Sequence, residues 1–385
     1  MMQSQLLKTR KGLLLIIACI SLIALQACSG SKRRSAADLT AITNPMNIER
    51  VWSVSLGKAL SYSFKPILIG NEVYASSESG EVYKINATTG KVIWNVVMPK
   101  TVSTGPGSDG SIVAVGSIKG EVYALDAQTG AKKWESSVGT EILTEPLVAA
   151  GLVVVRTIDN RFIAIDAQTG KRRWVTPKTP SLLSLRTSYS MAAINNEVIF
   201  TGFSSGQFGL INLVNGSTIW ESLLAPPKGT SEIERLSDIA AKPTLLGTRM
   251  CAVSYQGKVG CGDIKTAKMS WTKDFSSFSG TTQSPEAVYV VNDKSYLVAF
   301  DASRGEELWR NEKLVWRDVG EPLAFGKHIW AGDSQGYLHL FSQEKGDELG
   351  RVRVDSSGIS VGPIVSQGLV IVQTKGGTLA AYRIQ

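Results

Sequence analysis

The amino-acid sequence predicts an all-β fold, an eight-bladed β-propeller of four-stranded antiparallel blades. Three observations predict it: a repeat that returns about every 40 residues, four short strand segments within each repeat, and a last repeat that stops before its final strand. A period of this length is typical of arrays and propellers, and the lack of helical patterns between the strands favours the propeller. With 385 residues, 43% of them hydrophobic, the chain is long enough to form one large closed architecture.

The repeat is clearest in GEVYKINATTGKVIW, residues 80–94, and GEVYALDAQTGAKKW, residues 120–134. Its first residue is taken as position one. Position seven is Asp or Asn in the first six copies, position eleven is Gly except at Ala267, and position fifteen is Trp except at Gly350. The eight copies begin at Gly80, Gly120, Asn160, Gly206, Gly257, Ser295, Gly336 and Gly377.

The second copy shows how one repeat predicts the strands of a blade. A proline begins the innermost strand, where a missing backbone donor is tolerated, and IVAVGS and EVYALD are two further strands with a turn between them. Asp126 can then bond the backbone of the next turn, and we expect Gly130 to supply the positive φ of that turn. In the last strand, AKKWESS, the ring of Trp134 is suited to filling the wedge between two blades.

The eighth copy ends with GTLAAYRIQ, before its turn and its Trp. The segment ERVWSVSL, residues 49–56, contains Trp52 and predicts a strand of the missing type. We therefore expect the N-terminal strand to pair with the C-terminal blade, which removes the open edge of the ring. Residues 49–385 are predicted to form this single propeller.

The N-terminus predicts a lipoprotein signal peptide over residues 1–27. Basic residues precede a thirteen-residue apolar run, which is too short to span a membrane, and LQAC follows with Cys28. This box resembles the bacterial lipobox, whose Cys takes a diacylglyceryl group; an ordinary signal with a chance Cys is the alternative. With Ser29 after Cys28, the pattern resembles that of lipoproteins of the Gram-negative outer membrane, held at its periplasmic face. Residues 28–48 are predicted to be a lipidated flexible tether.

Two cysteines remain within the predicted propeller. Cys251 and Cys261 are ten residues apart across a predicted hairpin, SYQGKVG. A cross-strand disulfide and two buried thiols are both compatible with this spacing, because the register of the hairpin decides between them.

The unit A-x-D-x-x-T-G-x-x-x-W, as in ALDAQTGAKKW and AIDAQTGKRRW, resembles the repeat of pyrroloquinoline-quinone dehydrogenases. The same repeat occurs in the BamB family, non-enzymatic lipoproteins of the outer membrane assembly machine. The dehydrogenases imply an adjacent Cys-Cys disulfide, a Ca²⁺-bound quinone and an Asp base. This chain has no Cys-Cys pair and no C-x-x-C-H haem motif, and its two histidines, His328 and His339, lie in strand patterns. We expect no enzyme activity, no cofactor and no metal.

Two neighbouring connections between blades are enlarged. From the Trp to the next blade's opening position the chain runs 18 residues after Trp174 and 23 after Trp220, against 10 to 13 elsewhere. All such connections emerge on one face of a propeller, and long loops on a rigid ring are typical binding sites. Leu side chains beside Arg and Asp in these loops indicate a protein-binding patch; the alternative is that the Leu residues only pack the loops.

SLLSLR and SEIERLSD in these loops resemble BamB segments. The resemblance implies that Leu183, Leu185, Arg186 and Asp238 bind a periplasmic POTRA domain of BamA, while an expected second acid is replaced by Ala240. It implies a scaffold subunit of the BAM complex that meets other subunits through BamA and assists the folding and insertion of unfolded outer membrane proteins.

The alternative function is a periplasmic propeller that binds another protein or a small ligand in its channel. Nucleic acid is not expected as a partner, since the formal charge of +8 includes three basic residues of the signal peptide and forms no dense patch.

Overall fold

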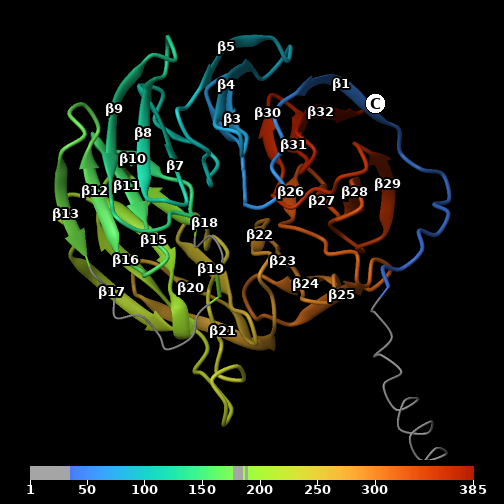
Figure 1. Ribbon diagram of the computed structural model, residues 1–385. Helices are drawn as coiled ribbons and strands as arrows, with labels where there is room; N and C mark the ends of the chain where they lie inside the picture. The colour runs from blue at the N-terminus through green and yellow to red at the C-terminus, as the bar shows by residue number, and fades with distance from the viewer. Residues whose placement is uncertain (1–34, 177–184, 187–189) are drawn as a thin grey trace, which may run out of the picture. The chain divides into compact units, whose positions relative to one another are not determined.

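The computed structural model describes residues 35–176, 185–186 and 190–385. Ala36–Gln385 form one compact unit. In this unit, eight four-stranded sheets are arranged as blades around a common centre (Figure 1). Neighbouring strands within each sheet run antiparallel. The predicted fold class is therefore confirmed. In the described part of the chain, no helix is long and apolar enough to cross a membrane.

Each blade is numbered in chain order, and its strands are given from the innermost to the outermost. Blades 1 to 4 consist of β2 (Ile67–Ile69), β3 (Glu72–Ser76), β4 (Glu81–Asn86) and β5 (Val92–Val97); β6 (Gly107–Ser108), β7 (Ile112–Gly116), β8 (Glu121–Asp126) and β9 (Lys132–Ser137); β10 (Leu147–Ala149), β11 (Leu152–Arg156), β12 (Phe162–Asp166) and β13 (Arg172–Thr176); β14 (Met191–Ile194), β15 (Val198–Gly202), β16 (Gln207–Asn212) and β17 (Thr218–Leu223).

A short 3₁₀ turn, η1 (Ser204–Gly206), joins β15 to β16. Blades 5 to 8 consist of β18 (Thr244–Leu246), β19 (Arg249–Val253), β20 (Gly257–Asp263) and β21 (Lys268–Phe275); β22 (Thr281–Gln283), β23 (Ala287–Val291), β24 (Leu297–Asp301) and β25 (Glu307–Asn311); β26 (Leu323–Phe325), β27 (His328–Gly332), β28 (Tyr337–Ser342) and β29 (Glu348–Arg353); β30 (Ile364–Ser366), β31 (Leu369–Gln373), β32 (Thr378–Ile384) and β1 (Ile48–Ser55).

The ring is closed by the N-terminal strand, as the sequence predicts. Strand β1 pairs antiparallel with β32, and Trp52 lies opposite Ala381. Strand β2 of blade 1 contacts β30 of blade 8. A hydrophobic cluster that includes Trp52 and Leu379 joins blade 8 to Val73 and Ile85 of blade 1. Blade 8 is thus assembled from both ends of the compact unit, and no sheet is left without neighbours.

The turn between the third and fourth strands follows the predicted chemistry. In blade 2, Asp126 Oδ1 accepts hydrogen bonds from the backbone N–H groups of Gln128, at 3.1 Å, and Thr129, at 2.9 Å. Gly130 has a φ of 75°, and its N–H donates to the Asp126 carbonyl at 2.8 Å. Each blade needs the same turn. Residues that cap this turn and residues that tolerate its positive φ therefore recur in the sequence.

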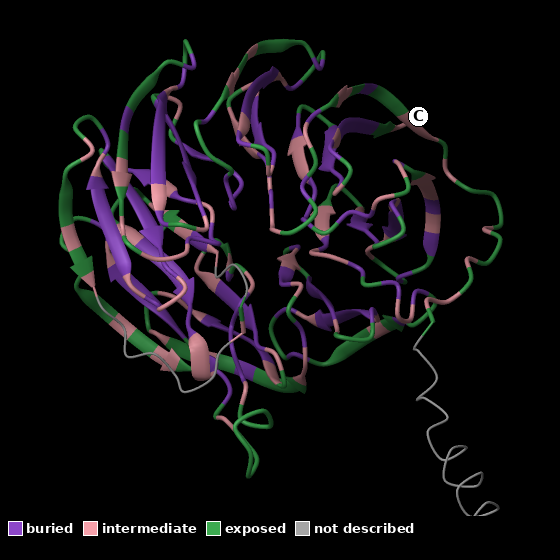
Figure 2. Cartoon of the chain, in the orientation of Figure 1, coloured by how far each residue is buried: buried purple, intermediate pink, exposed green. Residues whose placement is uncertain are grey.

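The position-fifteen Trp residues seal the junctions between blades. The Trp134 indole N–H donates to the carbonyl of Ala167 in blade 3 at 2.8 Å, and a Cβ added to Gly170 would lie 2.9 Å from its ring. Buried hydrophobic side chains form eight clusters, each shared by two adjacent blades. Figure 2 shows these buried residues on the inner strands, with the outermost strands largely exposed. The predicted wedge-filling role of the Trp residues is confirmed.

The exceptions at positions eleven and fifteen of the repeat fall at junctions that are built differently. Ala267 stands at position eleven of blade 5 and has a positive φ of 56°, although it is not Gly. The Trp of the preceding blade is Trp220. Trp220 meets Phe208 edge to face at 5.6 Å, and its indole nitrogen has no hydrogen bond among the described residues. Gly350 takes the place of a Trp, and there the Met46 N–H donates to the carbonyl of Leu349 at 2.7 Å.

Residues 36–47, named here the strap, lie on blades 6 and 7. The Ala37 N–H donates to the carbonyl of Val315 at 3.0 Å, and Arg317 donates to the carbonyl of Ala37 at 2.8 Å. Arg351 donates to the carbonyl of Thr40, and Leu39 packs against the hydrophobic cluster of blades 6 and 7. Over these residues the structure differs from the predicted flexible tether, because the main chain of the strap is bonded to the ring.

A buried network of charged side chains lies beneath the strap. Arg317 contacts Asp333 at 2.6 Å, and His339 lies between Asp333, at 3.1 Å, and Glu348, at 2.7 Å. Burial alone would lower the pKa of His339, but its hydrogen bonds to the two carboxylates outweigh burial and raise it. Burial would raise the pKa of Asp333, and its bonds with His339 and Arg317 lower it instead. Opposite charges therefore hold this part of blade 7 together.

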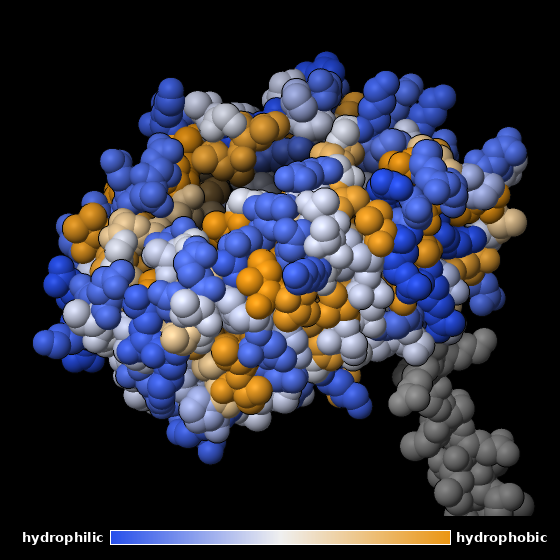
Figure 3. Space-filling model, turned by 90° about the horizontal axis from the view of Figure 1, so that it is seen from above, coloured by the Kyte–Doolittle hydropathy of each residue, from blue (hydrophilic) through white to orange (hydrophobic). Residues whose placement is uncertain are grey.

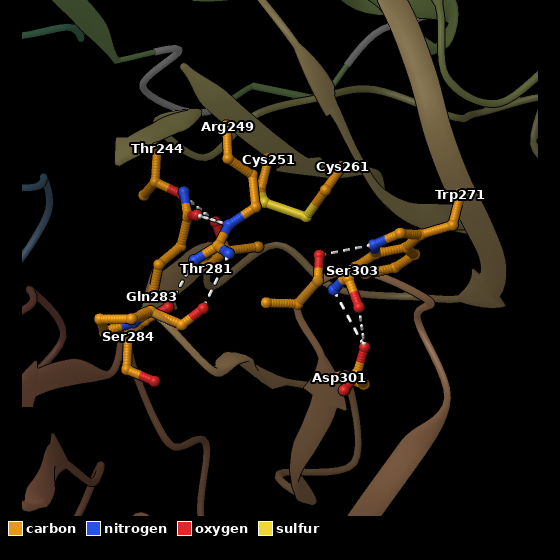
Figure 4. Close-up of a disulfide and its surroundings, with 12 residues drawn as sticks. Thr244, Arg249, Cys251, Cys261, Trp271, Thr281, Gln283, Ser284, Asp301 and Ser303 are labelled. Atoms are coloured by element: carbon orange, nitrogen blue, oxygen red, sulfur yellow. Dashed lines mark hydrogen bonds between the residues drawn. A yellow bond between two sulfur atoms is a disulfide. The ribbon is translucent and has the colours of Figure 1, made fainter. Parts of the chain in front are cut away.

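Blade 5 carries a disulfide between its two middle strands. Cys251 on β19 and Cys261 on β20 are directly opposed, with their Cα atoms 4.2 Å apart, and their sulfurs are bonded. Figure 4 shows this bond beside Arg249, which reaches across to Gln283 of blade 6 at 2.8 Å. Of the two arrangements compatible with the sequence, the structure has the disulfide.

Candidate functional site

The candidate site lies on one face of the ring, named here the loop face. Because the strands of a blade alternate in direction, the connections between blades emerge on the same face as the turns between second and third strands. The turns between third and fourth strands lie on the opposite face. The two enlarged connections join blade 3 to blade 4 and blade 4 to blade 5, so they neighbour each other on the loop face. Cys28 and Leu183 lie outside the described residues.

The structure places Leu185 and Arg186 between two anchors. The Leu185 backbone N–H donates to Oδ2 of Asp238 at 2.7 Å. The Arg186 guanidinium donates to Oε2 of Glu141 at 2.8 Å, and 57% of its side chain remains accessible to solvent. The enlarged connection after blade 3 is therefore bonded on one side to the loop before blade 3 and on the other to the loop before blade 5.

Asp238 has an internal role that the sequence did not indicate. Its residue is only 1% exposed, and Oδ1 accepts a hydrogen bond from the Ser205 N–H at 3.1 Å. Its carbonyl accepts one from the N–H of Tyr255 at 2.9 Å. One buried aspartate thus connects the turn of blade 4, the turn of blade 5 and the Leu185 segment. Within this chain Asp238 positions the loops, whereas Arg186 offers an exposed charge. The neighbouring Ala240, where an acid was expected, is also buried.

The second enlarged connection contains a hydrogen-bonded turn, in which the Arg235 N–H donates to the carbonyl of Ser231 at 3.1 Å. The backbone N–H groups of Thr230 and Ser231 both donate to Glu234 Oε2, at 2.9 and 3.1 Å. These bonds lower the pKa of the Glu234 carboxyl. The turn holds Ile233 with 65% of its surface exposed. Because the following residues 237–240 are buried, the connection is rooted in the ring rather than free along its whole length.

Sequence reasoning missed two residues that support the site, Glu141 and Arg156. Arg156 is 1% exposed and lies 5.1 Å from the ring of Phe162 and 5.5 Å from that of Phe203. Its guanidinium also donates to Oδ1 of Asn160 at 2.8 Å. Asn160 replaces the usual Gly at position one, so this departure from the repeat was a signal of an unusual partner. No comparable signal marks Glu141.

The mouth of the central channel opens beside Arg186. A hollow of ≈ 220 Å³ is lined by Arg186, Leu60, Tyr62 and Leu143, among other residues. Leu60 is 56% exposed, and Phe278, which lines the adjoining hollow, is 52% exposed. Figure 3, which is turned by 90° from the view of Figure 1, shows another side of the molecule, where apolar residues form separate patches between hydrophilic ones. Around the mouth, therefore, exposed apolar side chains lie near an accessible positive charge.

Deeper in the channel, four charged residues alternate in sign around the axis. They lie before the innermost strands of blades 1, 3, 5 and 7, and the first and last of them form an ion pair. Burial raises the pKa of Glu145 and lowers that of Lys242, although both face the channel space. All four line both a hollow of ≈ 320 Å³ and a cavity of ≈ 740 Å³. They are Lys65, Glu145, Lys242 and Glu321.

The site contains no arrangement that would hold a metal. Among the described residues, no group of three or more His, Cys, Asp or Glu side chains is placed to bind an ion. The Asp residues at position seven are engaged with their own turns, as Asp126 and Asp166 illustrate. The geometry instead presents loops, apolar side chains and one accessible guanidinium, which is the chemistry of protein recognition.

Comparison with known proteins agrees with this geometry. Residues 37–106, 96–311 and 298–385 match the family profile described as outer membrane protein assembly factor BamB. A protein of that description from Burkholderia pseudomallei (strain K96243) is 37% identical over 370 residues, covering 95% of this chain and 97% of the other. Another, from Pseudomonas aeruginosa (strain PAO1), is 42% identical over 368 residues, covering 94% and 97%.

Solved structures share the fold. The crystal structure of BamB from Moraxella catarrhalis has a TM-score of 0.81 at 24% identity, covering 88% of this chain and 100% of that one. A quinohemoprotein alcohol dehydrogenase from Pseudomonas putida HK5 has a TM-score of 0.70 at 15% identity, covering 88% and 76%. These likenesses concern the fold alone, and the dehydrogenase shows that the same ring can carry unrelated chemistry. By the family profile and by its relatives over nearly its full length, the chain belongs to the BamB family of outer membrane protein assembly factors.

Proposed function

We propose that this protein binds a periplasmic POTRA domain of BamA through its loop face and thereby serves the folding and insertion of outer membrane proteins. As a member of the BamB family it is an assembly factor of the BAM complex, associated with the outer membrane, and not an enzyme. The observation that carries the proposal is the pinned Leu185–Arg186 segment, with its backbone held by Asp238 and its guanidinium accessible beside the channel mouth.

The physical basis is an apolar contact area with a charged edge. The contact area includes the exposed side chains of Leu60, Ile233 and Phe278. Burying their apolar surface against a partner contributes about 25 cal/mol of binding free energy per Å². Arg186 supplies a planar donor group that recognises carboxylates. Its exposed pair with Glu141 contributes at most about 1 kcal/mol, so exchange for a partner's carboxylate costs little. Because Asp238 holds the backbone of Leu185 before binding, the cost of ordering this residue on binding is reduced.

Co-purification of BamA from detergent-solubilised membranes tests the docking. In the full-length chain, Leu185→Glu and Arg186→Glu should each weaken BamA recovery, since interface anchors cost on the order of 2 kcal/mol or more when lost. Val214→Glu is the matched control, because Val214 is 68% exposed in a turn between third and fourth strands on the opposite face. Undiminished recovery with both loop variants, at unchanged thermal stability, would contradict the proposal.

Asp238→Ala separates positioning from contact. Removing this carboxylate leaves the N–H groups of Leu185 and Ser205 without their acceptor, which costs about 1–3 kcal/mol. We therefore expect lower thermal stability and weaker BamA recovery together, whereas Leu185→Glu should lower recovery alone. A variant at Asp238 that keeps its stability and loses BamA would indicate that this side chain contacts the partner directly.

We also propose that acylated Cys28 anchors the chain to the outer membrane at its periplasmic face. The support is the lipobox LQAC after an apolar run of signal length. Cys28→Ser should leave the chain unlipidated, and mass analysis of the N-terminal peptide and membrane fractionation would show it. If the wild-type peptide carried no acyl mass, the anchor would be wrong, and the docking proposal would be unaffected.

A further inference from the structure

The outermost strands of the blades are the exposed edges of the eight sheets. Each is paired on one side only within its sheet. Natural proteins protect such edges with charged side chains, because an unprotected edge invites another strand. Seven of the eight outermost strands contain charged residues, for example KKWESS in β9 and TIWESL in β17. Strand β5, with the sequence VIWNVV, contains none.

The side chains of β5 are divided between two faces. Trp94 and Val96 pack against the cluster between blades 1 and 2. Ile93 and Val97 alternate with them and are 47% and 66% exposed. Beside its open edge, β5 therefore presents an apolar row to solvent with only the neutral Asn95 between its members.

Strand β17 has a charged residue at the position that corresponds to Asn95 of β5. Its Ile219 and Leu223 are 48% and 50% exposed and correspond to Ile93 and Val97. Between them stands Glu221, whereas β5 has Asn95 at that position. Blade 7 shows a second form of protection, because the strap lies beside β29 and Met46 donates to the carbonyl of Leu349. Blade 1 has neither a charge nor a covering segment at its outermost strand among the described residues.

We infer that the edge of β5 binds an extended polypeptide segment as a fifth strand of blade 1. A row of backbone N–H and C=O groups at a sheet edge is completed only by another extended main chain. The apolar row favours a segment in which every second residue is apolar. Because β5 contains no charged residue, it requires no particular charge in that segment. Membrane strands of outer membrane β-barrels alternate in this way. The occupant is thus a barrel strand that has not yet folded, an identification that rests on the role of the family in outer membrane protein assembly.

The test measures the binding of a peptide to the full-length chain in detergent, with fluorescence anisotropy as the readout. The probe is a short synthetic peptide of alternating Val and Thr residues with a terminal Arg and a dye. A second peptide carries N-methyl groups on alternate amides of one edge, which keeps the side chains and removes the donors. We expect the wild-type chain to bind the first peptide, and to bind the second on the order of tenfold more weakly.

Two variants locate the binding on β5. Asn95→Glu introduces the charge that β17 carries, and it should lower the affinity for the first peptide about threefold. Val97→Lys should also lower this affinity. Thr272→Glu on β21 is the matched control, since this exposed residue has the same register position in blade 5. It should leave the affinity unchanged.

Three results would overturn the inference: no binding of the first peptide, equal binding of the methylated peptide, or equal binding by the β5 variants. The outcome is independent of the docking proposal. Leu185→Glu should keep peptide binding and lose BamA, whereas Asn95→Glu should keep BamA and lose peptide affinity.

Discussion

The junction between blades 2 and 3 and the junction between blades 7 and 8 solve the same packing problem in different ways. In the first, Trp134 fills the wedge, donates to Ala167 and rests on Gly170. In the second, Gly350 leaves the wedge open, and Met46 and Ile48 of the N-terminal segment occupy it. A repeat position can therefore lose its consensus residue when a segment distant in sequence supplies the missing surface.

A third junction, between blades 4 and 5, departs from the rule without such a replacement. Trp220 is present, but the residue it should rest on is Ala267, which has a side chain and a positive φ of 56°. This junction also lies beneath the enlarged loop that contains Asp238. From this comparison we expect the junction between blades 4 and 5, where the longest connection emerges, to be less stable than the junction between blades 2 and 3.

The largest expected effect comes from removing a Trp seal. Trp134→Ala should lower the free energy of unfolding by about 3–5 kcal/mol, because it leaves a cavity in the cluster shared by blades 2 and 3 and removes the donor to Ala167. Denaturant unfolding of the full-length chain measures it, and Trp134→Phe should recover part of the loss. A loss below about 1 kcal/mol would show that the Trp residues do not hold the junctions.

A smaller effect is expected from the charged network beneath the strap. His339 faces Asp333 and Glu348, with Arg317 and Arg351 beyond them, and its pKa is raised. The stability it contributes is therefore complete below its unfolded pKa of about 6.5, and it is lost as pH rises through the folded pKa. Asp333, whose pKa is lowered, contributes in the opposite sense and is lost as pH falls through its folded pKa.

His339→Gln measures this contribution. The variant should be less stable than wild type by about 1–3 kcal/mol below pH 6.5, and the difference should shrink as pH rises. His328→Gln is the control, because burial lowers the pKa of His328 and its contribution has the opposite sign. A His339 variant whose deficit grows with pH would contradict the charged network.

The sharpest comparison comes from exchanging the same two residue types at position eleven, and it includes the smallest expected effect. Gly170→Ala should destabilise the chain by about 1–3 kcal/mol, since a Cβ would meet the Trp134 ring and the φ is 70°. Ala267→Gly should instead stabilise it by up to about 1 kcal/mol, because Gly adopts the positive φ of this position without strain. If both substitutions changed the free energy of unfolding in the same direction, the proposed difference between the two junctions would be wrong.

The parts of the fold that depend on local chemistry could be predicted from the sequence. Position seven caps a turn, position eleven needs a positive φ, and Trp52 completes the last blade, so the repeat itself encodes eight closed blades. The strap was missed because it binds largely through main-chain groups, as in the bond from Arg317 to the Ala37 carbonyl, which leave no periodic pattern.

The candidate site was predictable only in part. Loop length and composition indicated Leu185 and Arg186, and the structure brings both to the loop face beside the channel mouth. The inward orientation of Asp238 depends on Ser205 and Leu185, which are far from it in sequence, so its positioning role required the structure. The disulfide likewise depended on a register that only the paired strands define.

Site-specific photocrosslinking in cells tests the central claim most directly. A benzoylphenylalanine placed at Leu185 on the loop face and, separately, at Val214 on the opposite face reports which surface meets BamA. The account predicts a crosslink to the periplasmic region of BamA from position 185 and none from position 214. Crosslinking from position 214 with none from position 185 would contradict it.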